Sequence, residues 1–264
     1  MGIRDYGIIF GNDTPGPGIT DNLTLSRAIA PYVDGTKIEF YNKELVKYTR
    51  RQTKKPVIAD WKLSAIGFWD KMKEEWTGTM SKHILALKST RADYVTCQLF
   101  PGIGSREAVE VASRPPCKLK IIGLAGMTQE YADFTFKHPL DRKYVKNVAK
   151  KYGIETLEDR INECKTISDF LLVMGEEVYR VDGYIGLGND TESLKRFRQF
   201  TDKSIFATAL GRQSKISIKE QMRNVYDICG RKSAVIVASY IWQSKNPIER
   251  AVELKQWREE MVGW

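Results

Sequence analysis

The sequence predicts a (β/α)8 TIM-type barrel. Eight short apolar runs alternate with helical patterns along its 264 residues, and strands that alternate with helices predict a parallel sheet. This length is ordinary for a closed eight-stranded barrel, which is therefore favoured over an open doubly wound sheet. No G-x-G-x-x-G follows the first apolar run, which counts against a dinucleotide-binding sheet.

Each expected strand is an apolar run, several of them rich in β-branched and aromatic residues, bounded by turn residues or charges. The expected strands are 6–10, 35–40, 56–61, 92–100, 118–126, 182–186, 204–210 and 233–239. The helices expected between them are 22–32, 42–53, 68–90, 104–113, 140–151, 155–178, 190–200, 216–228 and 246–260. Capping-box-like sequences mark the helix starts at 105–108 and 189–197, and Pro247 suits a first helical turn.

We expect one α/β-barrel domain, 1–264, because no Pro/Ser-rich linker or repeat divides the chain. The segment 127–181 lies between the fifth and sixth expected strands and is too long for one crossover helix. It is therefore expected to be a helical insertion on the barrel, with two helices.

The net charge of +9 indicates attraction to phosphate, either on a small ligand or on nucleic acid. The basic stretches 42–56 and 137–153 match no known nucleic-acid motif, and the second mixes acids with bases. Nucleic acid is thus a possible partner but not the favoured one. No apolar run approaches the roughly 20 residues of a membrane span, so no membrane association is expected.

Cysteine and histidine usage gives no indication of a metal site. The four cysteines lie far apart without a C-x-x-C pair, and the chain has only two histidines. Reduced thiols of this kind are typical of cytosolic proteins. The N-terminal residues lack the layout of a signal peptide, which also favours a cytoplasmic location.

Charged residues gather where the expected strands end, the place at which such barrels carry their chemistry. In PVIADWKLSAIG (56–67), Asp60 and Lys62 are two residues apart, so on a strand they share one face. Lys37 and Glu39 end the neighbouring strand. Further polar residues near strand ends are Asn12, Asp13, Gln98, Arg212, Gln213 and Ser239.

Several segments resemble the orotidine 5'-monophosphate decarboxylase family in order and spacing. They are GTKIEF, VIADWKLSAI, ADYVTCQLFPG, YIGLGNDTESLKRFR and SAVIVASYIWQSKNPIERAVEL, which together with their spacing cover most of the chain except 127–181. The D-x-K pair also resembles that of sugar-phosphate decarboxylases of the same superfamily. The resemblance implies a barrel fold, a phosphorylated nucleotide or sugar as ligand, no organic cofactor, and a homodimer with sites between subunits.

Carried over onto this chain, the resemblance implies a catalytic array of Lys37, Asp60 and Lys62. The ions neutralise one another, which offsets the cost of burying each charge. The array would stabilise a carbanion, with Lys62 as proton donor. The family's final carboxylate is replaced by Ala65, although Glu39 is a candidate substitute. The alternative is a structural ion pair that closes the barrel mouth.

The resemblance also implies substrate-binding residues. Gln213 matches a phosphate-contacting residue, and Ser239 stands where the family has a phosphate-binding Arg. Arg212 is a candidate to supply that lost cation, because its guanidinium suits phosphate. Thr128 lies near the position that reads the pyrimidine. Asp13, or its neighbour Asn12, matches the carboxylate that holds the ribose.

The predicted function is therefore that of a divergent decarboxylase, a carbon–carbon lyase of pyrimidine metabolism that acts on a phosphorylated nucleotide or sugar. The first alternative is a catalytically inactive homologue that binds a nucleotide or another partner, favoured by the changes at Ala65 and Ser239. The second is a nucleic-acid-associated protein, which only the net charge supports.

Overall fold

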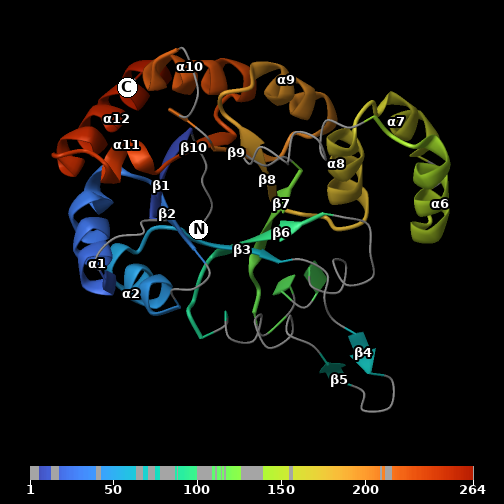
Figure 1. The fold of residues 1–264 in the computed structure, drawn as a ribbon, viewed down its shortest axis with the longest axis horizontal. Helices are drawn as coiled ribbons and strands as arrows, with labels where there is room; N and C mark the ends of the chain where they lie inside the picture. Colours follow the sequence, from blue (N-terminus) through green and yellow to red (C-terminus); the bar gives the residue numbers. More distant parts are fainter. Residues whose placement is uncertain are drawn as a thin grey trace.

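The computed structural model shows a barrel of strands surrounded by helices (Figure 1). It describes residues 6–12, 18–39, 43–63, 68–70, 75–77, 87, 89–99, 109–110, 112–113, 115, 117–125, 139–154, 157–208, 210–211 and 216–263.

Among these residues, eight parallel strands close into a barrel in the order β1-β10-β9-β8-β7-β6-β3-β2. Closure follows from β1, which pairs with β2 on one side and with β10 on the other. All eight expected strands are confirmed, with ends that differ by at most two residues. They are β1 (Gly7–Asn12), β2 (Gly35–Glu39), β3 (Val57–Leu63), β6 (Tyr94–Gln98), β7 (Lys120–Leu124), β8 (Gly183–Leu187), β9 (Ser204–Thr208) and β10 (Ser233–Val237).

Helices connect the strands and cover the barrel from outside (Figure 1). The described helices are α1 (Gly18–Ile29), η1 (Ala30–Tyr32), α2 (Lys43–Thr53), α6 (Arg142–Tyr152), α7 (Glu158–Glu163), α8 (Ile167–Glu177), α9 (Thr191–Phe200), α10 (Ile218–Cys229), α11 (Ser239–Trp242) and α12 (Pro247–Val262). Two expected helix starts are confirmed, since Asp190 caps α9 and Pro247 begins α12. The third, at 105–108, lies outside the described residues. The short helix α11 was not expected.

The start of the expected helix 68–90 is wrong. Phe68–Asp70 and Glu75–Thr77 form the antiparallel strands β4 and β5, with Trp69 paired to Trp76. Lysine and glutamate between them favoured a helix in the sequence. Aromatic residues and threonine have higher strand propensity, and pairing across a hairpin adds to it.

The segment 127–181 contains more helices than expected. Its described part holds α6, α7 and α8 instead of two helices. The expected helix 155–178 is divided because Thr166 and Asp169 form a reciprocal capping box that begins α8 anew. Helices α6 and α7 lie beyond α8 at the edge of the molecule (Figure 1).

Side chains alternate between two cores because successive strand residues face opposite sides. One cluster fills the barrel interior and consists of Ile9, Ile58, Tyr94, Ile122, Leu124, Ile185, Phe206, Ala234 and Ile236. A larger cluster lies between the strands and the helices. The interior is therefore packed, as in other barrels of this type, and leaves chemistry to the strand ends.

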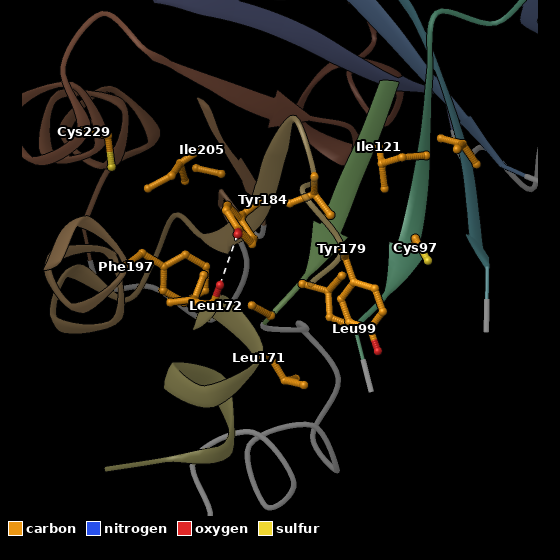
Figure 2. Packing of buried hydrophobic residues seen from close by; sticks show 14 of the residues in the cluster. Cys97, Leu99, Ile121, Leu171, Leu172, Tyr179, Tyr184, Phe197, Ile205 and Cys229 are labelled. Atoms are coloured by element: carbon orange, nitrogen blue, oxygen red, sulfur yellow. Dashed lines mark hydrogen bonds between the residues drawn. The ribbon is translucent and has the colours of Figure 1, made fainter. Parts of the chain in front are cut away.

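The packing of α8 against β8 requires a glycine. The Tyr184 hydroxyl donates a hydrogen bond to the carbonyl of Leu172, 3.2 Å away (Figure 2). A Cβ atom at Gly175 would lie 2.5 Å from the same hydroxyl oxygen. Burial raises the pKa of Tyr184, so the hydroxyl stays protonated and serves as a structural donor.

None of the described helices combines the length and apolar character that crossing a membrane requires.

Candidate active site

The candidate site begins with the register of β2 and β3. Ile58 belongs to the interior cluster, so Asp60, two residues further along the strand, occupies the same inner face. Lys37 is the register partner of Ile58 on the neighbouring strand, and Glu39 is that of Asp60. The two strands therefore bring Lys37 and Asp60 together inside the barrel, toward its carboxyl-terminal mouth.

A direct hydrogen bond joins these two side chains. The Lys37 Nζ donates to Oδ2 of Asp60 over 2.6 Å. Only 6% of Lys37 and 8% of Asp60 is exposed, so the ion pair is almost fully withdrawn from water. Burying such a pair costs desolvation energy that its attraction offsets only with good geometry and further hydrogen bonds.

Thr96 supplies one such further hydrogen bond. It lies on β6, the next strand around the barrel, and its hydroxyl donates to Oδ1 of Asp60 over 2.8 Å. Both carboxylate oxygens of Asp60 therefore have a donor, and Thr96 is itself fully buried. Sequence reasoning missed Thr96. The signal was present, because in YVTCQ it follows the inward Tyr94 by two residues and so shares its face.

Lys62 is placed on β3 by its backbone. It follows Asp60 by two residues within the strand. The pairing of β3 with β6 shifts register between Ala59 and Leu63, through a β-bulge or another irregularity, so regular alternation does not fix the face of Lys62. The Lys62 side chain lies outside the described residues, as do Ala65 and the Glu39 side chain. The complete array stays a prediction.

The side-chain amide of Asn12 donates hydrogen bonds to helix α1. Its amide Nδ2 donates to the hydroxyl of Ser26 over 2.8 Å and to the carbonyl of Asn22 over 3.2 Å, both on α1. It is also 3% exposed. Asn12 thus ties β1 to the outer helix layer, which leaves Asp13 as the candidate for holding a sugar. Asp13 lies outside the described residues.

Ser239 is the one predicted substrate-binding residue within the described part. It begins α11 directly after β10 and lines an open cavity of about 480 Å³, together with Gln243, Lys245 and Arg250. This position, at the end of the eighth barrel strand, is where barrels of this type frequently bind phosphate. Thr128, Arg212 and Gln213 lie outside the described residues.

Other reactive groups near the site are unsuited to chemistry. Cys97 follows Thr96 but belongs to the outer cluster. Burial raises the pKa of its thiol to about 12, so it is protonated and a poor nucleophile near neutral pH. In the described ranges, no group of three or more His, Cys, Asp and Glu side chains is arranged to hold a metal ion.

In sequence comparisons the chain matches no family model and no curated protein. Solved structures do match it. The orotidine 5'-monophosphate decarboxylase of Methanocaldococcus jannaschii, complexed with the inhibitor BMP, has a TM-score of 0.67 and 21% identity, over 96% of this chain and 98% of that chain. The Leishmania donovani orotidine monophosphate decarboxylase has a TM-score of 0.69 and 12% identity, over 99% and 95% of the two chains.

A third match is the Leishmania donovani UMP synthase, with a TM-score of 0.70 and 14% identity. It aligns with 98% of this chain, which spans 54% of the synthase chain. The chain therefore has the α/β-barrel fold of the orotidine 5'-monophosphate decarboxylases. At these identities the likeness establishes the fold alone.

Proposed function

We propose that the chain is a divergent orotidine 5'-monophosphate decarboxylase-like carbon–carbon lyase, acting on a phosphorylated nucleotide or sugar. The observation that carries the proposal is the buried Lys37–Asp60 hydrogen bond on the inner face of the barrel. The shared fold with decarboxylases of known structure supports it. A charged pair in a costly buried position is typical of a functional site.

In the proposed reaction, the bond between the substrate carbon and its carboxylate breaks and carbon dioxide leaves. The electron pair remains on the substrate carbon, and the Lys62 ammonium adds a proton there. Asp60 holds Lys37, and by the proposal Lys62, so that the positive charges are in place before the carbanion forms. Such preorganised charge lowers the barrier without reorganisation during the reaction. The proposal requires no cofactor or metal.

The substrate phosphate is proposed to bind between the loops after β9 and β10. Arg212, Gln213 and the backbone N–H groups near Ser239 would hold it, while Asp13 and Thr128 would contact the sugar and the base. The position of Ser239 after the last barrel strand supports this arrangement. If Arg212→Ala leaves the stabilisation by nucleotides unchanged, Arg212 has no such role.

The working form is proposed to be a cytoplasmic homodimer with its sites between subunits. In a homodimer the partner copy also has Ala65, so the carboxylate missing at this position would have to come from another residue, for which Glu39 is the candidate. Sedimentation equilibrium tests the dimer directly, and a monomer at every concentration would contradict it.

Turnover of orotidine 5'-monophosphate itself is expected to be very slow or absent. Ala65 removes a carboxylate that would help hold Lys62, and Ser239 removes a phosphate contact that would orient the substrate. Each loss costs roughly 2–4 kcal/mol at the transition state, about 30- to 1000-fold in rate. The assay is the loss of orotidine absorbance with metal-free protein, with Lys62→Met as the inactive control.

A panel of ligands separates the proposal from its alternative. Orotidine, uridine and pentose phosphates should raise the melting temperature if the pocket is kept. Release of carbon dioxide from a carboxylated nucleotide or sugar phosphate, lost in Lys62→Met, supports the lyase. Stabilisation by ligands without any turnover supports an inactive homologue. The changes at Ala65 and Ser239 favour this alternative.

A further inference from the structure

Helix α6 carries a basic face that the candidate site does not use. Its sequence, RKYVKNVAKKY, contains five basic residues and no acid. The buried side chains are Val145, Val148 and Ala149, which anchor one side of the helix to the protein. The residues on the opposite side are all exposed. We call them the α6 face: Lys143, Tyr144, Lys146, Asn147, Lys150 and Lys151.

The helix is held firmly at both ends by other residues. Asp141 is the N-cap and accepts hydrogen bonds from the backbone N–H groups of Lys143 and Tyr144. Gly153 ends the helix in a left-handed conformation. Arg142 donates to the carbonyls of Ile161 and Cys164 and so fixes α6 to α7. Asp141 and Arg142, the acid and the arginine nearest to the α6 face, therefore stabilise the helix and its contact with α7.

The lysines of the α6 face have no such task. Within the described part of the chain, none of the four forms an ion pair or a side-chain hydrogen bond. Lys143, Lys146 and Lys150 are three and four residues apart, so they are neighbours on one side of the helix, where like charges destabilise it. By contrast, on the basic helix α2, Lys47 pairs with Glu44 and Arg51 lies over Tyr48. Binding of an anion from outside the chain would therefore reduce the repulsion between the lysines of the α6 face.

An exposed aromatic ring lies among these charges. Tyr144 is 51% exposed and is next to Lys143 in the chain. Lys143 and Lys150 are seven residues apart, which separates them by about 10 Å along the helix axis. A stripe of cations beside a free aromatic face is the combination that binds single-stranded nucleic acid, through its phosphates and by stacking of a base.

We propose that the α6 face is a docking surface for single-stranded nucleic acid. A membrane is less suitable, because the apolar side of α6 is buried against the protein and cannot enter a lipid layer. An acidic protein would neutralise the lysines, but its binding would not explain why an aromatic ring is exposed among them. The location of α6 beyond α8, at the edge of the molecule, keeps the surface away from the barrel mouth (Figure 1).

The test is fluorescence anisotropy of a labelled oligouridylate at several salt concentrations. Four lysines that each neutralise a phosphate predict a slope of about −3 in log affinity against log salt. Affinity should then fall about 50-fold between about 50 and 200 mM salt. The variant Lys143→Gln, Lys146→Gln, Lys150→Gln, Lys151→Gln should lose this binding and its salt dependence. Tyr144→Ser should weaken binding by roughly fivefold or more.

The matched control removes the same charge elsewhere. Lys118, Arg180, Arg223 and Lys232 are exposed cations outside α6, and all four are changed to glutamine. The control should bind as the unchanged protein does. Equal weakening in both variants would overturn the proposal, because net charge alone would then explain binding. Equal binding of duplex RNA, polyglutamate or phosphatidylserine vesicles would also overturn it, since none of these uses an exposed base.

Because the α6 lysines form no ion pair or side-chain hydrogen bond within the described residues, and their like charges repel one another, the quadruple variant should keep the melting temperature of the unchanged protein or raise it slightly. Thermal denaturation of the variant is measured beside the binding assay. Absence of oligouridylate binding in the folded, unchanged protein at low salt would end the proposal without any variant.

Discussion

Two aspartates at opposite ends of the same strand pair, β3 and β6, show how the barrel uses a carboxylate in two ways. At the amino-terminal base, Asp93 precedes β6, and its Oδ2 accepts from the backbone N–H of Val57 and from Arg50 Nε, over 3.0 and 3.2 Å. At the mouth, Asp60 on β3 accepts from the side chains of Lys37 and Thr96. Asp93 binds a backbone N–H group and an arginine of the outer helix α2, whereas Asp60 binds other inward side chains.

The arrangement at the base recurs around the barrel. Asp34 precedes β2 and accepts from the backbone N–H of Ile8, and Asp182 precedes β8 and accepts from that of Ile121, both over 2.8 Å. A recurring carboxylate that fixes the start of a neighbouring strand is explained by the fold. The buried charges at Asp60 have no such explanation. In these barrels the base serves stability and the mouth serves chemistry.

The largest expected effect is that of Asp60→Ala. It leaves the Lys37 ammonium buried without its carboxylate, which should lower the free energy of unfolding by about 3–5 kcal/mol. Urea denaturation measures the change. The double variant Lys37→Met, Asp60→Leu removes both charges and should recover most of this loss. A double variant as unstable as the single one would show that the pair is held for stability.

Thr96→Val should have the next largest effect. Valine keeps the shape of threonine but removes the hydroxyl that donates to Asp60 Oδ1. Losing a hydrogen bond to a charged group costs about 1.5–3 kcal/mol of unfolding free energy. Thr96→Ser, which keeps the hydroxyl, is the control for the lost bond. If valine and serine give the same unfolding free energy, this hydrogen bond contributes nothing measurable.

Asp93→Ala should cost less than either change at the mouth. The Val57 N–H loses its acceptor, but Asp93 is 17% exposed and water can partly replace it. We expect a loss of about 1–2 kcal/mol in urea denaturation. Ligand-induced changes in melting temperature should be the same as in the unchanged protein. A selective loss of ligand stabilisation would contradict the division between base and mouth.

Arg50→Met should have the smallest effect. The Arg50 side chain is 30% exposed, and its ion pair with Asp93 spans 3.2 Å in contact with water. Such pairs contribute at most about 1 kcal/mol, so thermal denaturation should shift only slightly. A loss of stability as large as that of Asp60→Ala would show that the Arg50–Asp93 ion pair stabilises the protein as much as the buried Lys37–Asp60 pair does.

The sequence was sufficient for the barrel because apolar runs and helical patterns alternate regularly. Strand alternation was also sufficient to place Asp60 on the inner face of its strand. Its pairing with Lys37 was expected from the family resemblance, and the catalytic role of both residues stays a prediction. Thr96 was not predicted, because a threonine within an apolar strand has many neutral uses. The hairpin at Trp69 and Trp76 was missed because lysine and glutamate between them favoured a helix. The positions of residues in the loops at the mouth depend on long-range packing, which the hydrophobic periodicity of the sequence does not indicate.

The central claim is that Lys37 and Asp60 serve a ligand at the barrel mouth. The most direct test is isothermal titration calorimetry with orotidine, uridine and pentose phosphates. It compares the unchanged protein with the double variant Lys37→Met, Asp60→Leu, using Asp93→Ala as the control. We expect binding to the unchanged protein and to Asp93→Ala, and loss of binding in the folded double variant. Equal binding by all three proteins, or no binding by the unchanged protein, would contradict it.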